Sequence, residues 1–164
     1  MNQKRSVLDA RIPETGALAQ VKKGFVGGVL ATLIMTVFLL LGMFMNGSPY
    51  PQPVPLAIVE RIVGTGWPGA VLVIVGSICH LLYGGAWAGI FALAAQPISE
   101  AKGVALGLLL WLLEQILVVP LLGWGVFGSQ IVDTIAVNSV VILAGTSLFF
   151  HLIYGLAVGM LLNQ

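Results

Sequence analysis

Four long apolar stretches constrain what this chain can fold into. Each exceeds the about 20 residues that a helix needs to cross the hydrocarbon core of a bilayer. Charged residues make up 8% of the chain, whereas a soluble domain carries about a quarter, so we expect lipid to solvate this protein. Backbone polar groups find no water in hydrocarbon, and barrel-like alternation is absent, so each stretch is predicted to be a helix. The predicted spans cover about 24–46, 69–96, 103–127 and 139–162.

The distribution of basic residues predicts how the chain is oriented in the cell membrane. Five of the seven lysines and arginines precede the first span, in a polar N-terminal tail over residues 1–22 and at its junction with that span. Lys102 lies between the second and third spans, and only Arg61 falls on the opposite side. The positive-inside rule then places both termini in the cytoplasm. The net charge of +1 gives no reason to expect a nucleic-acid partner.

A repeated motif divides the chain into two halves. His-Leu-Leu-Tyr-Gly at 80–84 recurs as His-Leu-Ile-Tyr-Gly at 151–155, and these segments contain both histidines of the chain. Lys-Gly-x-x-x-Gly opens the first span at 23–28 and the third at 102–107. Each half holds two spans, so the halves enter the membrane from the same side and are predicted to be parallel repeats about the membrane normal. The predicted repeats cover residues 23–96 and 102–162.

Two short segments between the spans are predicted to lie in the outer interface. Residues 55–64 and 130–137 each place apolar side chains on one helical face, with Glu60 or Asp133 toward water. The favoured interpretation is a lid that caps the bundle, and the alternative is a docking surface or a gate.

Small residues at steps of four share a helical stripe with each histidine. Steps of four lie on one face of a helix, and small residues let helices approach closely in lipid, where packing drives association. The favoured interpretation is therefore a pair of tight helix seams, with each histidine bonded to a carbonyl, a tyrosine or Glu114. The glycines predicted to pack helices are Gly24, Gly28, Gly76, Gly84, Gly103, Gly107, Gly155 and Gly159.

The two histidines also permit a cofactor interpretation. His80 and His151 are predicted to lie at similar depths on different spans, as the axial ligands of a b-type haem would. The glycines beside them would leave smooth helix surfaces for the macrocycle. No cofactor is expected on the favoured packing interpretation, and haem b is the alternative.

A carboxylate lies in the middle of the third span. An ionised Glu114 in hydrocarbon costs several kcal/mol unless it is paired or protonated, and Pro120 downstream is expected to kink this helix or free a carbonyl. Two interpretations stay open: a protonated hydrogen-bonding acid, or a proton relay with a histidine. The predicted intramembrane polar site comprises Glu114, Gln115, Tyr83, Tyr154 and Thr36.

Motifs of catalysis and metal binding are missing from the sequence. It holds no phosphate loop and no nucleophile elbow. Cys79, its single cysteine, forms no thiol cluster for a metal. We therefore predict no catalytic residues, no metal site and no enzymatic activity.

The order of these motifs resembles a known family. Lys-Gly-x-x-x-Gly at the start of a span, a short outer segment and His-Leu-x-Tyr-Gly-x-x-x-Gly in the next span resemble an uncharacterised family of small four-helix bacterial membrane proteins, over about residues 22–162. The resemblance implies a fold and no activity.

The sequence thus predicts an all-α integral membrane four-helix bundle of two parallel two-helix repeats, multi-pass in the cell membrane. The favoured function is a non-enzymatic accessory or structural subunit of a larger membrane assembly, with partner membrane subunits or a homo-oligomer. One alternative is a haem-binding electron-transfer subunit with His80 and His151 as axial ligands. Another is a small oligomeric transporter or channel that uses Glu114 as a proton or ion site.

Overall fold

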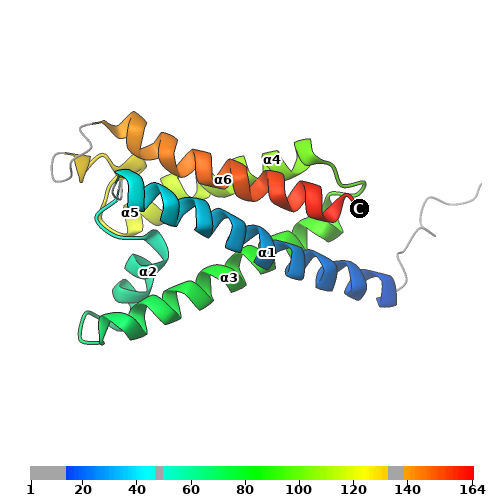
Figure 1. The fold of residues 1–164 in the computed structure, drawn as a ribbon, viewed down its shortest axis with the longest axis horizontal. Coiled ribbons are helices and arrows are strands. Elements are labelled where there is room, and N and C mark those ends of the chain that lie inside the picture. Colours follow the sequence, from blue (N-terminus) through cyan, green and yellow to red (C-terminus); the bar gives the residue numbers. More distant parts are fainter. Residues whose placement is uncertain (1–13, 47–49, 133–138) are drawn as a thin grey trace, which may run out of the picture.

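Helices make up all the regular structure in residues 14–46, 50–132 and 139–164, the part of the chain that the computed structural model describes (Figure 1). Four helical segments among these residues are long and apolar enough to cross a membrane, which confirms the prediction of an all-α chain with four such helices. The elements are α1 (Glu14–Asn46), α2 (Val54–Val63), α3 (Gly69–Ala94), α4 (Glu100–Leu113), the π-helical η2 (Glu114–Val118), α5 (Val119–Leu121), the 3-10 turn η3 (Val126–Gly128) and α6 (Val140–Leu162).

The first helix begins earlier than the sequence predicts. Helix α1 begins at Glu14, and its membrane-spanning part begins at Gly16, whereas residues 1–22 were predicted to be a polar tail. Residues 17–23 are mostly good helix formers, so the helix continues past the point where the apolar pattern weakens.

The third span ends earlier than the sequence predicts. Helix α5 ends at Leu121, not near residue 127. Gly123 and Gly125 follow with φ of 82° and 74°, left-handed conformations that favour glycine and stop a helix. An outer helix was predicted at 55–64, and α2 occupies Val54–Val63. Most of the second predicted outer segment, 130–137, including Asp133, lies outside the described residues.

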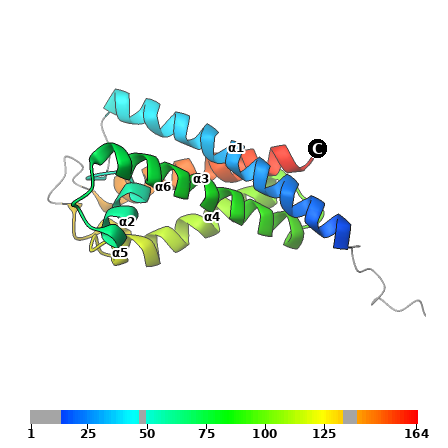
Figure 2. The same cartoon turned by 90° about the horizontal axis from the view of Figure 1, so that it is seen from below.

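The four long helices form two hairpins. Helix α1 packs on α3, α4 packs on α6, and contacts between α1 and α6 join the hairpins. The start of α1, the α3–α4 connection and the end of α6 lie at one end of the bundle (Figures 1 and 2). We call this the basic end, because Lys22, Lys23 and Lys102 lie there. At this end Lys23 Nζ donates to the backbone oxygen of Gln164 at 2.6 Å.

Glycines bring the backbones of each hairpin into direct contact. A Cβ on Gly24 would lie 2.5 Å from the carbonyl oxygen of Ala88, and one on Gly103 would lie 2.7 Å from the Cα of Gly159. One turn further along, Gly28 meets the backbone of Gly84 and Gly107 meets those of His151 and Gly155. Within each hairpin the two helices therefore cross at glycine positions that correspond in the repeated motif. Gly76 has a different role, because a Cβ on it would lie 3.3–3.4 Å from the backbone of Pro55 and Leu56 in α2.

Beyond these crossings the helices of the first hairpin separate. Toward the end opposite the basic end, which we call the distal end, α1 and α3 diverge (Figures 1 and 2). Helix α2 packs on α3 and buries Ala57 and Val59. The connection before α2 also closes this end, where Tyr50 stacks on Trp124 with ring centroids 5.5 Å apart.

Gly107→Ala is expected to destabilise the bundle. The new methyl group would press on the carbonyl of His151 and lie 3.3 Å from the Cα of Gly155, and overpacking costs about 1–3 kcal/mol. Gly145→Ala is the control, because nothing lies within 4 Å of its Cβ position. That change should be neutral or stabilising by up to about 1 kcal/mol, the helix-propensity difference. The effect of each substitution is measured as the change in the free energy of unfolding in mixed detergent micelles. Equal effects of the two substitutions would contradict close backbone packing at Gly107.

Candidate functional site

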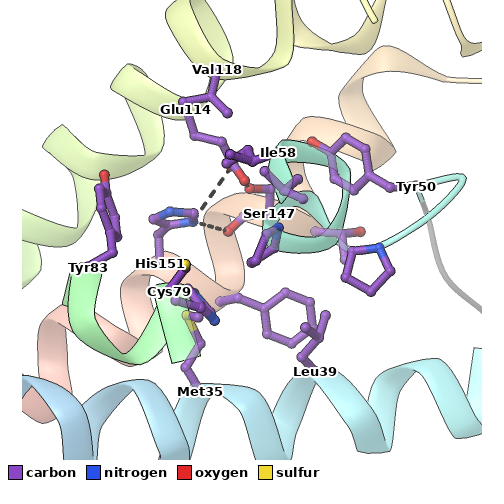
Figure 3. Close-up of a pocket in the computed structure, with 16 residues that line it drawn as sticks. Met35, Leu39, Tyr50, Ile58, Cys79, Tyr83, Glu114, Val118, Ser147 and His151 are labelled. Carbon is purple, nitrogen blue, oxygen red and sulfur yellow. Dashed lines mark hydrogen bonds and ion pairs between the residues drawn. The ribbon is translucent and has the colours of Figure 1, made fainter. Parts of the chain in front are cut away.

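A pocket of about 280 Å³ lies in the distal half of the bundle, between the two hairpins and against α2 (Figure 3). Helices α1, α3 and α6 and the π-helical η2 contribute to its walls. One wall is polar and carries Glu114 from η2 with Ser147 and His151 from α6. The other lining residues are Met35, Leu39, Tyr50, Pro53, Val54, Pro55, Ile58, Cys79, His80, Tyr83, Val118, Thr146 and Phe150.

The π-helical segment η2 presents Glu114 to the pocket. It covers Glu114–Val118, and the backbone N–H of Val119 reaches the carbonyl of Glu114, five residues earlier. Pro120 follows directly; it has no N–H to donate, and its ring pushes away the carbonyl four residues earlier. Both effects favour a wider turn at this point. Single π-helical turns within α-helices are frequent at functional sites.

Glu114 is the centre of a hydrogen-bonded cluster. Its Oε2 accepts from the Ser147 hydroxyl in a short hydrogen bond and from Gln115 Nε2 at 2.9 Å. His151 Nδ1 lies 3.9 Å from the same oxygen. Only 14% of the Glu114 side chain and 18% of the His151 side chain are exposed. Hydrogen bonds to a charged acceptor are the strong ones, so these donors stabilise negative charge on Oε2.

Gln115 connects this cluster to the distal cap. Its side chain is completely buried, and its Nε2 lies 3.2 Å from the Tyr50 hydroxyl and 3.4 Å from Ser147 Oγ. Burial raises the pKa of Tyr50 to about 12, and the negative charge of Glu114 acts in the same direction. The phenol therefore stays protonated at neutral pH and contributes a neutral hydroxyl to the cluster.

The hydrogen bond of His151 identifies which ring nitrogen carries a proton. Nδ1 lies 2.9 Å from the backbone oxygen of Ser147. A carbonyl oxygen only accepts hydrogen bonds, so Nδ1 is the donor. In the neutral ring Nε2 is then unprotonated and able to take up a proton or bind a metal. His80 lines the same pocket, and no hydrogen bond of its ring falls within the described residues.

The structure gathers some of the predicted polar residues and separates others. His80, Tyr83, Glu114 and His151 line one pocket, and Gln115 lies behind it. Tyr154 instead donates to the carbonyl of Gly84 at 2.6 Å in the contact between α6 and α3.

Thr36 also lies outside this cluster. Its hydroxyl donates to the carbonyl of Thr32 within α1, at 2.7 Å, and it does not line the pocket. No group of three or more His, Cys, Asp or Glu side chains suited to hold a metal occurs among the described residues.

Two residues of the cluster were not among the predicted polar site residues. Ser147 lies one helical turn before His151 on the same stripe, so the step of four could have identified it. Tyr50 lies 65 residues from Gln115, and no sequence pattern links the two.

The comparisons with known proteins define a family. Residues 18–164 match the family model of DUF6789, a family of unknown function. The chain belongs to this family. The match confirms the predicted resemblance to an uncharacterised family. No curated protein and no solved structure matches the chain.

Ser147→Ala should weaken the fold measurably. It removes the hydroxyl that donates to Glu114, and hydrogen bonds between helices in membranes contribute about 0.6–2 kcal/mol. The control is Thr146→Val, because the Thr146 hydroxyl bonds only within its own helix, to the carbonyl of Ile142 at 2.8 Å. Unfolding in mixed micelles should show the loss for Ser147→Ala alone. A larger effect at Thr146 would contradict the importance of the cluster.

Proposed function

We propose that this protein is a non-enzymatic integral membrane protein that binds a small, largely apolar ligand in the intramembrane pocket and couples its binding to protonation of Glu114 and His151. One observation carries the proposal: Glu114 lies on the pocket wall, hydrogen-bonded to Ser147 and Gln115 and 3.9 Å from His151. Apart from Glu100 at the start of α4, it is the only carboxylate in the four spans.

The composition of the pocket wall supports ligand binding. Small-molecule pockets are mostly apolar, with a few polar groups that orient the ligand, and occupy about 300–1,000 Å³. This pocket lies near the lower end of that range at about 280 Å³. Its apolar wall includes Met35, Leu39, Ile58 and Phe150, and its polar groups converge from η2 and α6.

The pairing of an acid with a histidine supports proton exchange. Ionisable groups in membrane spans commonly mark proton or ion pathways. Neutral His151 offers Nε2 to a proton, while Glu114 has donors arranged around Oε2. One proton can therefore be held by either residue of the pair. This arrangement favours the interpretation in which Glu114 is a proton or ion site.

The orientation and the repeat belong to the same proposal. We infer that the basic end faces the cytoplasm, following the positive-inside rule, which places the pocket in the outer half of the bilayer. Equivalent glycine crossings in the two hairpins, Gly28 with Gly84 and Gly107 with Gly155, support a parallel repeat about the membrane normal.

Two other roles have specific tests. Histidine ligands of metals commonly bond one ring nitrogen to a carbonyl, as His151 does through Nδ1. A haem between His80 and His151 would give a Soret band that both His80→Ala and His151→Ala remove. An accessory role in a larger assembly is compatible with the pocket and would be seen as subunits that copurify from native membranes.

Filling the pocket should change the protonation of Glu114. Val118 lines the pocket, so Val118→Trp acts as a tethered occupant, whereas the side chain of Leu117 is 53% exposed on the surface of the bundle. Acid-minus-alkaline infrared spectra in lipid vesicles should show a carboxyl band that Glu114→Gln removes. Its midpoint pH should move in Val118→Trp and stay in the Leu117→Trp control. A Glu114 band that never titrates, or that moves equally in both variants, would refute the proposal.

The inferred orientation predicts a labelling pattern. In a Cys79→Ser background, a cysteine replacing exposed Ser129 at the distal end should react with a membrane-impermeant maleimide on intact cells. A cysteine replacing exposed Ala101 at the basic end should react only after permeabilisation. The reverse pattern would place the pocket in the inner half of the bilayer.

A further inference from the structure

We propose that the ligand of the pocket is a lipophilic monocation, an amine or ammonium group on an aromatic or aliphatic body, which exchanges with a proton at Glu114 and His151. This inference rests on the proposed function and specifies its ligand class. It follows from the charges, the free acceptor and the aromatic surfaces that line the pocket.

The pocket is lined by one acid and no lysine or arginine. The titratable groups facing Glu114 are His151 from α6, Cys79, His80 and Tyr83 from α3, and Tyr50 from the distal connection. Helices α1 and α2 contribute only uncharged side chains to the lining. With neutral histidines and an ionised Glu114, the wall carries one negative charge. A buried charge is costly without a partner, so a monocation is the ligand that neutralises it.

Glu114 offers one oxygen to a ligand. Both described hydrogen bonds to its carboxylate end on Oε2. The side chain remains 14% exposed and lines the pocket, and Oε1 accepts no hydrogen bond from a described residue. Oε1 is therefore the carboxylate oxygen left to meet an ammonium group.

The hydrogen-bond donors of the cluster are already in use, which disfavours a neutral ligand that must accept hydrogen bonds from the protein, such as a carbonyl compound. The Ser147 hydroxyl already donates to Glu114, and His151 Nδ1 already donates to the backbone carbonyl of Ser147. Gln115 is completely buried behind the wall. The wall formed by Glu114, Ser147 and His151 thus presents acceptors rather than free donors, and the ring N–H of His80 lies on the α3 side of the pocket. A cation satisfies acceptors, whereas a carbonyl ligand would leave them unpaired.

Aromatic side chains complete the cation site. Tyr50, Tyr83 and Phe150 line the pocket together with the acid. The negative faces of aromatic rings attract ammonium groups, most strongly where water is excluded, and sites for quaternary ammonium ligands combine several rings. An organic cation therefore meets both the carboxylate and ring surfaces, which a hydrated inorganic cation would use poorly.

Proton and ligand compete for the same charge. A proton on the Glu114–His151 pair cancels the negative charge that attracts the cation, so release of one monocation and uptake of one proton leave the pocket charge unchanged. Binding of the cation should therefore weaken as the pH falls, and the groups that respond are Glu114 and His151, with His80 facing the same space.

The test uses the full chain in lipid nanodiscs and its single cysteine as the reporter. Cys79 lines the pocket and is exposed, so a bound ligand should slow its reaction with N-ethylmaleimide. The probes are benzyltrimethylammonium and its neutral carbon isostere, neopentylbenzene, which have the same shape and differ in charge. We expect the cation to protect Cys79 at concentrations at least about tenfold lower than the isostere, a preference of about 1.4 kcal/mol.

Two variants separate charge from shape. Glu114→Gln should abolish the preference for the cation while keeping any protection by neopentylbenzene, which also reports an intact pocket. Glu60→Gln is the control, because Glu60 bonds to Gln52 Nε2 at 2.7 Å and lies outside the pocket. It should keep the preference.

The outcomes distinguish this inference from the proposed function. Equal protection by both probes, unchanged in Glu114→Gln, would overturn the cation and leave the pocket function in place. Protection by neither probe in the wild-type protein would also overturn the cation. The proposed function falls with it only if the infrared band of Glu114 also fails to respond to Val118→Trp.

Discussion

Backbone contact between helices is the constraint on which the rest of this structure depends. In lipid, helices gain no hydrophobic energy by associating, so they must pack closely. Glycines at Gly28, Gly84, Gly107 and Gly155 allow the helices of each hairpin to touch through their backbones. These crossings lie toward the basic end, and the helices of the first hairpin diverge beyond them (Figure 1). The pocket, which α1, α2 and α3 line beyond the crossings, follows from this divergence.

The polar cluster lies beside the pocket, at the point where the third span departs from α-helical geometry. The π-helical turn at Glu114–Val118 brings Glu114 to the pocket wall and Gln115 into the protein interior. Each of these polar side chains would be costly alone in the bilayer. Ser147 donates a hydrogen bond to Glu114, and Tyr50 accepts one from Gln115. The cluster is therefore held by elements from both halves of the chain. The proposed coupling between ligand binding and protonation rests on these shared hydrogen bonds.

Particular residues show how far sequence reasoning extends. The motif around His80 and His151, together with the position of Glu114 in its span, identified three side chains that line one pocket. Thr36 and Tyr154 have similar depth and chemistry, yet they bond to the carbonyls of Thr32 and Gly84. Depth along a helix can be counted from the sequence. The direction of a side chain around that helix depends on which neighbour covers it.

The sequence by itself determined the helical class and the number of apolar spans, because a backbone in hydrocarbon must satisfy its hydrogen bonds within each segment. It also determined the family, whose model matches residues 18–164. The tertiary structure alone decided that Tyr50 and α2 line the pocket and that Ser147 donates to Glu114. Those features depend on the angle and depth at which helices cross. Contacts between distant segments set that geometry, and no local pattern in the sequence encodes it.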